Sequence, residues 1–99
     1  MSTEPRIMTL HPQGKAGVNI LLRRYEQVKT VLLEIVSETT PIPFDSLTDK
    51  AEERLKTEKF DGKPLWYIVS VKLDLEARGI LKRVPKTSPH QLRLTQVED

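Results

Sequence analysis

The sequence contains no cysteine, and this absence excludes a disulfide framework, a thiolate metal site and a cysteine nucleophile. No apolar run approaches the roughly 20 residues that a membrane-spanning helix needs. The N-terminal segment also lacks a basic start followed by an apolar stretch, which is the pattern of a secretory signal. We therefore expect a soluble, cytoplasmic protein with no membrane partner.

Residues suited to metal, phosphate or acid–base chemistry are also scarce. His11 and His90 have no cysteine partners and no paired spacing, so the sequence predicts no metal site. Residues 14–17 (GKAG) lack the spacing and the following Ser or Thr of a phosphate-binding loop. Asp74 and Glu76 are expected to face outward, which leaves no carboxyl group in an apolar setting suited to catalysis. We expect neither an enzyme nor a bound cofactor.

What the sequence does contain is enough for one small domain. Its 99 residues are 37% hydrophobic, and a chain of this size can bury roughly 60–65% of its unfolded surface. Residues 1–18 hold two prolines, two glycines and few periodic apolar positions, so they predict an irregular N-terminal arm. We expect a folded domain over residues 19–95 and a short tail over residues 96–99.

The first strong periodic signal lies between residues 21 and 38. Apolar residues recur there at spacings of three and four, which places them in one arc of a helix. Asn19 is a candidate N-cap. The segment 39–43 (TTPIP) ends the helix, because a residue that precedes proline is pushed toward extended geometry. The apolar arc consists of Tyr25, Val28, Val31, Leu32, Ile35 and Val36.

A second, shorter helix is predicted to begin at Asp45 or Ser46, either of which can cap it, and to run to about Lys59. Phe44 precedes the cap and is expected to pack on the helix as a hydrophobic staple. The apolar stripe of this helix consists of Leu47, Ala51 and Leu55.

A third helix is predicted over residues 64–78. Pro64 suits the first helical position, and Gly79 suits the left-handed geometry that follows a helix end. After Gly79 the apolar period changes to two, so residues 80–84 and 91–95 predict a hairpin. The buried arc of the third helix is expected to contain Leu65, Ile68, Val71, Lys72 and Leu75. The core as a whole is expected to combine Val28, Leu32, Ile35, Leu47, Ile68, Val71, Leu75 and Leu81.

A spaced pattern joins the end of the third helix to the strand after it. An apolar residue is followed four positions later by leucine, four later by glycine, and then by two apolar residues and a basic one. This pattern resembles that of bacterial winged-helix regulators of the MarR-like group. The order helix, short extended piece, helix, helix, hairpin is also that of the winged helix-turn-helix. The residues are Val71, Leu75, Gly79, Ile80, Leu81 and Arg83.

The resemblance implies a mainly α fold, with three helices and a small C-terminal β-hairpin called the wing. Residues 11–20 and 71–83 also resemble a small family of uncharacterised bacterial proteins, and this second likeness implies no known activity.

Winged-helix proteins that bind DNA place the third helix in the major groove and the wing over the backbone or minor groove. Here residues 62–95 carry seven basic and two acidic side chains, or +5 in a chain of net charge +2, which favours a polyanionic partner. The outward arc of the third helix, with Tyr67, Ser70, Asp74 and Arg78, has no mid-helix Arg, Asn or Gln for a bidentate base contact. Double-stranded DNA is therefore expected as a partner that is read with modest discrimination. The candidate DNA-binding residues are Lys63, Tyr67, Ser70, Arg78, Arg83, Lys86 and His90.

A side arc of the same helix, formed by Trp66, Val69 and Leu73, is apolar as well. One helix needs two apolar faces only where something covers the second. Residues 14–22, a second chain in a homodimer, or the first helix could cover it. Two functions therefore stay open: a DNA-binding module that acts as a transcriptional regulator, and a protein-interaction or self-association module that does not bind DNA.

Overall fold

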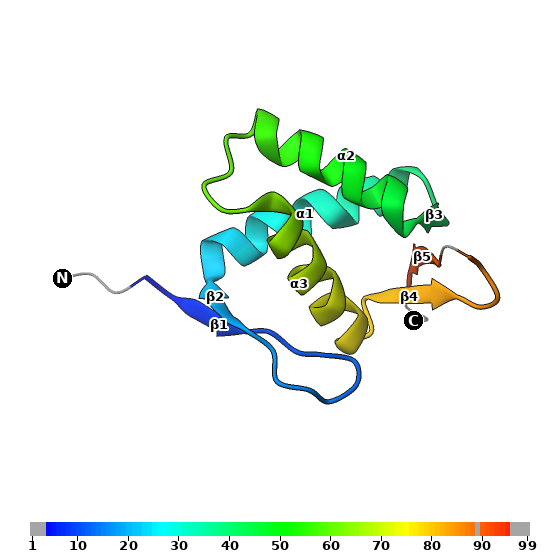
Figure 1. The fold of residues 1–99 in the computed structure, drawn as a ribbon, viewed down its shortest axis with the longest axis horizontal. Coiled ribbons are helices and arrows are strands. Elements are labelled where there is room, and N and C mark those ends of the chain that lie inside the picture. Colours follow the sequence, from blue (N-terminus) through cyan, green and yellow to red (C-terminus); the bar gives the residue numbers. More distant parts are fainter. Residues whose placement is uncertain (1–3, 89, 96–99) are drawn as a thin grey trace, which may run out of the picture.

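The computed structural model describes residues 4–88 and 90–95. Three helices pack together in the middle of the molecule, with one small antiparallel sheet on either side of them (Figure 1). The predicted tail, residues 96–99, lies outside the described residues. The helices are α1 (Leu22–Glu38), α2 (Phe44–Thr57) and α3 (Pro64–Ala77), and the strands are β1 (Arg6–Met8), β2 (Asn19–Leu21), β3 (Ile42–Pro43), β4 (Leu81–Val84) and β5 (Gln91–Leu94).

The three predicted helices are confirmed, and their ends show which local signals acted. Helix α1 stops at Glu38, before the two prolines, and α3 has Pro64 in its first turn. Gly79 follows α3 with φ of +77°, a conformation that glycine adopts without steric cost. The prediction that Asn19 caps α1 is wrong, because Asn19 belongs to β2 and its side chain accepts a hydrogen bond from Arg6.

Helix α2 begins two or three residues earlier than the predicted caps imply. Phe44 is its first residue rather than a staple before the cap, and Pro43 occupies the N-cap position. The Phe44 ring stacks on His90, with ring centroids 5.1 Å apart. The aromatic side chain therefore links the start of α2 to the C-terminal hairpin.

The N-terminal segment forms a β-hairpin through β1 and β2, so the predicted arm is not irregular throughout its described part. Strands β1 and β2 pair antiparallel, with Ile7 opposite Ile20. Beyond β1, the Thr9 amide donates to the Val18 carbonyl at 2.8 Å, and the Thr9 hydroxyl accepts from the Val18 amide at 2.9 Å. A Cβ at Gly17 would lie 1.8 Å from the Thr9 carbonyl oxygen, so this close approach requires glycine.

The C-terminal hairpin is confirmed, and it belongs to a three-stranded antiparallel sheet of order β3-β5-β4. Strand β3, between α1 and α2, pairs with β5 through Ile42 opposite Leu92, both almost fully buried. The two sheets together give the fold more strand content than the predicted single hairpin, so the class is α/β rather than mainly α.

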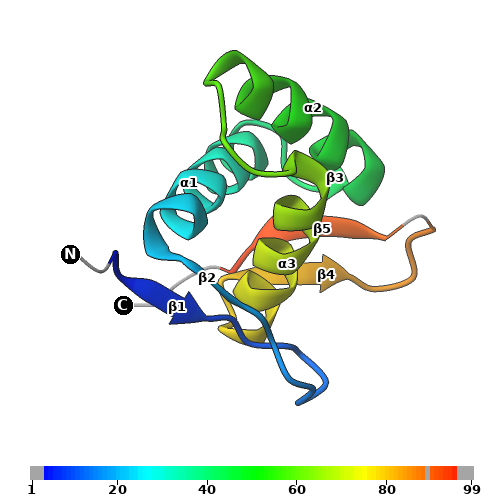
Figure 2. The same ribbon diagram turned by 60° about the vertical axis from the view of Figure 1, so that its left-hand side comes forward.

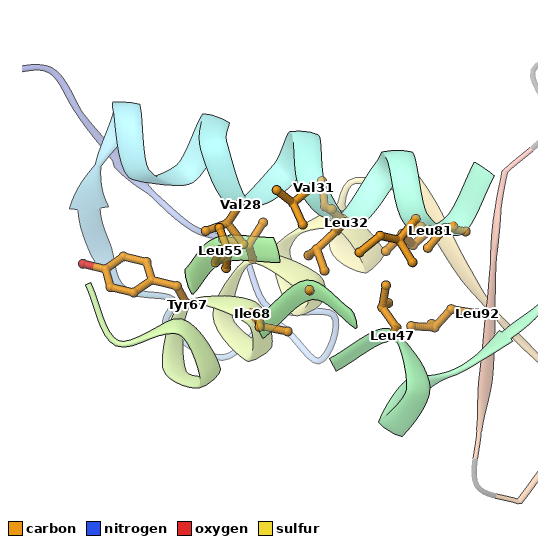
Figure 3. Packing of buried hydrophobic residues seen from close by; sticks show 14 of the residues in the cluster. Val28, Val31, Leu32, Leu47, Leu55, Tyr67, Ile68, Leu81 and Leu92 are labelled. Atoms are coloured by element: carbon orange, nitrogen blue, oxygen red, sulfur yellow. The ribbon is translucent and has the colours of Figure 1, made fainter. Parts of the chain in front are cut away.

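The core lies where the three helices meet the inner side of the C-terminal sheet (Figures 2 and 3). The predicted position of Leu65 in the core is wrong, because its side chain is 49% exposed. Ile20 from the N-terminal hairpin is buried in the core, although the sequence did not predict it there. The predicted core is otherwise confirmed, with exposure of 3% or less for Val28, Leu32, Ile35, Leu47, Ile68, Val71, Leu75 and Leu81.

Candidate nucleic-acid interface

Helix α3 buries a wider arc than expected: Lys72 is buried as predicted, and Tyr67 and Asp74 are buried as well. Tyr67 was predicted to face outward, and this is wrong: it is 8% exposed, and its hydroxyl accepts a hydrogen bond from Arg24 at 2.9 Å. Its ring meets the edges of the Phe60 and Trp66 rings, with centroids 5.1 and 4.9 Å away. In Figure 3 the Tyr67 ring closes one end of the labelled core residues. Tyr67 is therefore a packing residue whose ring is not open to a ligand.

Asp74 was also predicted to face outward, and it is fully buried. Its carboxylate accepts hydrogen bonds from the Leu10 amide at 2.8 Å, from Arg78 Nε at 2.8 Å and from the Tyr25 hydroxyl. Burial, followed by the bond to Asp74, raises the pKa of Tyr25 above its ordinary value. The carboxylate ties α3 to α1 and to the N-terminal hairpin, and Arg78 is occupied by this pairing.

The second acid that was predicted to face outward is Glu76, whose side chain is only 7% exposed. It accepts from Arg83 Nε at 2.7 Å and lies 3.1 Å from Lys72 Nζ, a buried ammonium. Burial alone would raise the pKa of Glu76, but its bonds to Arg83 and Lys72 outweigh burial and lower it. Burial lowers the pKa of Lys72 despite the pairing.

His90 lies beside this ion-paired cluster and against Phe44. Its pKa is lowered, first by burial and then by the charges of Lys72 and Arg83. A neutral, half-buried imidazole is a poor phosphate ligand. The structure therefore gives His90 a packing role in the connection between β4 and β5.

These burials leave the outer surface of α3 apolar. Leu65, Trp66 and Val69 are between 42% and 49% exposed. Ser70 is half-buried and is the remaining polar side chain at the outer surface between Pro64 and Ala77. A helix that reads base edges in a major groove needs several projecting donors and acceptors. The described part of α3 offers few.

The cations that remain exposed belong mainly to the C-terminal hairpin. Lys82 lies directly opposite Arg93 in the β4–β5 pairing, and both are exposed. Lys86 is exposed in the connection between the strands. These three cations, here called the hairpin cations, form no ion pair among the described residues. Like charges directly opposite each other across two strands destabilise the pairing.

The predicted DNA-binding residues therefore separate into those that are free to contact DNA and those that are paired or packed inside the protein. Lys63, before α3, and Lys86 are exposed and available. Arg78 and Arg83 are bound to Asp74 and Glu76, while Tyr67 and His90 pack inside. Lys82 and Arg93 were not predicted from the sequence to be neighbours. Pairing the residues of the two strands one by one, starting next to the connection, places Lys82 opposite Arg93.

No group of three or more His, Asp or Glu side chains could hold a metal ion among the described residues. No described helix is both long enough and apolar enough to span a bilayer.

Comparisons with known proteins extend over most of the fold. No curated protein matches the chain, and no solved structure matches it. A family model described as "Family of unknown function (DUF6958)" matches residues 6–92, from the start of β1 into β5, which is well over half of the chain. The chain therefore belongs to DUF6958, a family of unknown function.

Proposed function

We propose that the chain is a winged-helix protein that binds duplex DNA through the phosphate backbone, in the role of a transcriptional regulator. The order α1, β3, α2, α3, β4, β5 supports this, because it is the element order of the winged helix-turn-helix. In this proposal the β4–β5 hairpin is the wing.

The observation that carries the proposal is the separation of charge within residues 62–95. Both acidic side chains of this segment, Asp74 and Glu76, are buried in ion pairs. The exposed charge that is left is cationic, namely Lys63 and the hairpin cations. The Lys82–Arg93 pair costs stability in the free protein, and a polyanion relieves that repulsion. Phosphate oxygens spaced along a duplex are such a polyanion.

The same geometry predicts weak sequence discrimination. Contacts to phosphate position a protein on DNA but carry no base information. The outer surface of α3 lacks donors, so DNA shape and bridging water would have to supply any sequence preference. Tyr67→Ala is expected to destabilise the fold rather than to change base preference.

The decisive variant is Arg93→Glu. It replaces a repulsive cross-strand pair with an attractive Lys82–Glu pair, so the hairpin should be as stable as before or more so, by about 0.2–1 kcal/mol. DNA affinity should nevertheless fall for every duplex sequence, and the log–log salt slope should shrink by about 0.9 for each lost phosphate contact. Lys86→Glu should act in the same direction. Lys50→Glu makes an equal charge change on the exposed surface of α2 and serves as the matched control.

Binding is measured by fluorescence anisotropy with labelled duplexes of different sequence at about 50 mM salt. The proposal expects binding at micromolar protein, a loss with Arg93→Glu and little change with Lys50→Glu. No binding at low salt, or equal losses for both variants, would refute it.

A second candidate function is favoured by one observation, the exposed surface of Leu65, Trp66 and Val69. A winged-helix module that binds protein, with no affinity for DNA, would use this surface instead of the hairpin. Such a module would show no binding to duplex DNA at low salt.

A further inference from the structure

Helix α3 reverses the usual distribution of side chains. Its three charged residues, Lys72, Asp74 and Glu76, are turned inward and paired. Burying charged groups costs free energy. The apolar side chains of Leu65, Trp66 and Val69 are nevertheless exposed to solvent. Here these three apolar residues are called the α3 face. A helix with this arrangement presents an uncharged apolar surface along its outer side.

The N-terminal hairpin extends this surface but does not cover it. Residues 9–11 and 16–18 line a small, partly open pocket of about 80 Å³ with Ser70 and Leu73, at the next turn of α3. Trp66 is 46% exposed, so the alternative in which residues 14–22 cover it is wrong. Helix α1 does not cover it either, since Trp66 remains 46% exposed. The exposed large hydrophobic residues of the described chain all lie on α3 or on this hairpin: Met8, Leu10, Leu65, Trp66 and Val69.

We infer that the α3 face binds the same face of a second copy of this chain. In this dimer the two α3 helices run antiparallel across a two-fold axis that passes near Val69. The inference goes beyond DNA binding and does not depend on it.

The exposed apolar area fits a standard dimer contact. The five residues together expose an area on the order of 400 Å², since a fully exposed aromatic side chain contributes about 150–250 Å² and an aliphatic one somewhat less. A standard interface buries about 800 Å² on each partner, a little over half of it apolar. The exposed residues thus supply about the apolar area that one side of such an interface needs.

Charge complementarity favours a second copy over a charged partner. A two-fold contact brings a surface against itself, and the α3 face has no charge to repel its own copy. Lys63 is exposed at the N-terminal end of α3, where the helix dipole disfavours a cation, and the last turn of α3 contains no basic residue. Antiparallel pairing places Lys63 beside the partner's C-terminal helix end, where a cation is favoured. The nearby Arg78 is already matched by Asp74.

Sedimentation equilibrium of the full chain over about 1–500 µM tests the inference, because weak dimers lie in this range. We expect a monomer–dimer equilibrium, and a blue shift in the fluorescence of Trp66, the single tryptophan, as concentration rises. Val69→Glu should weaken the dimer by about tenfold or more, since an unpaired charge would be buried. Thr30→Glu adds the same charge to an exposed position on α1 and should leave the dimer unchanged.

A mixing experiment tests the symmetry. Val69→Glu and Val69→Lys should each be monomeric alone but should form a heterodimer when mixed, because opposite charges then meet at the two-fold axis. Circular dichroism of each variant confirms that it is folded. A wild-type chain that stays monomeric at the highest concentration, or a dimer that Val69→Glu does not weaken, would overturn the inference. So would a dimer whose mixed variants fail to pair.

Discussion

The buried carboxylate of Asp74 provides the sharpest test of how the elements are held together. Replacing it with alanine removes the acceptor for the Leu10 amide and the Tyr25 hydroxyl, which come from the N-terminal hairpin and α1. Arg78 also loses its partner, but its side chain is 34% exposed and can turn to water.

The loss of stability in Asp74→Ala arises because two hydrogen-bond donors are left without an acceptor. A buried donor left without an acceptor costs about 1–3 kcal/mol. The Tyr25 hydroxyl is buried and should incur most of this, while the amide of the exposed Leu10 should incur less. We expect Asp74→Ala to lower the free energy of unfolding by about 2–4 kcal/mol. Domains of this kind have about 5–15 kcal/mol in total.

Urea denaturation followed by circular dichroism measures this cost, and a double-mutant cycle with Tyr25→Phe locates it. Tyr25→Phe should destabilise the wild type but should be neutral or stabilising with Asp74→Ala, because it removes the stranded hydroxyl. The coupling should be at least about 1 kcal/mol. Asp49→Ala, at an exposed position on α2, should change stability by no more than about 0.5 kcal/mol. A loss below about 1 kcal/mol with Asp74→Ala, or equal effects of Tyr25→Phe in both backgrounds, would refute the reasoning.

Two further expectations concern stability. Leu75→Ala, at a fully buried position of α3, should cost about 2–5 kcal/mol in urea denaturation, and a value near zero would contradict its place in the core. The pKa of His90 is lowered by burial, so the unfolded chain binds the proton more readily. The stability that His90 contributes is therefore full above its ordinary pKa of 6.5 and is lost as the pH falls below it. His90→Phe, which keeps the stacking on Phe44, should flatten the change in urea midpoint between about pH 7.5 and 5.5. An unchanged pH dependence would exclude His90 as its source.

The sequence predicts those parts of the fold whose signals are local. The spacing of apolar residues identifies α1 and α3, and Pro64 and Gly79 mark the ends of α3 because each acts on its own backbone. The N-terminal hairpin gives no such signal. Its strands are three residues long, and its closest approach depends on Gly17 meeting Thr9 across the turn. Strands this short show no alternation.

The candidate site is harder to predict because its geometry depends on distant partners. Asp74 can be buried only because Tyr25 and the Leu10 amide, 49 and 64 residues away in sequence, satisfy its carboxylate. This burial fixes the rotation of α3 and so decides that Leu65 faces solvent and Tyr67 faces the core. The neighbouring positions of Lys82 and Arg93 depend on strand register. A helical wheel contains none of this information.

The pairing of β3 with β5 has a consequence for how the chain folds. Ile42 and Leu92 lie half the chain apart, and both α2 and α3 lie between them. Closing so long a loop loses conformational entropy before any contact compensates for it. We therefore expect the helices to dock first and the three-stranded sheet to close last. In a kinetic experiment, Leu92→Ala should then accelerate unfolding more than it slows refolding, whereas Leu32→Ala in α1 should do the reverse.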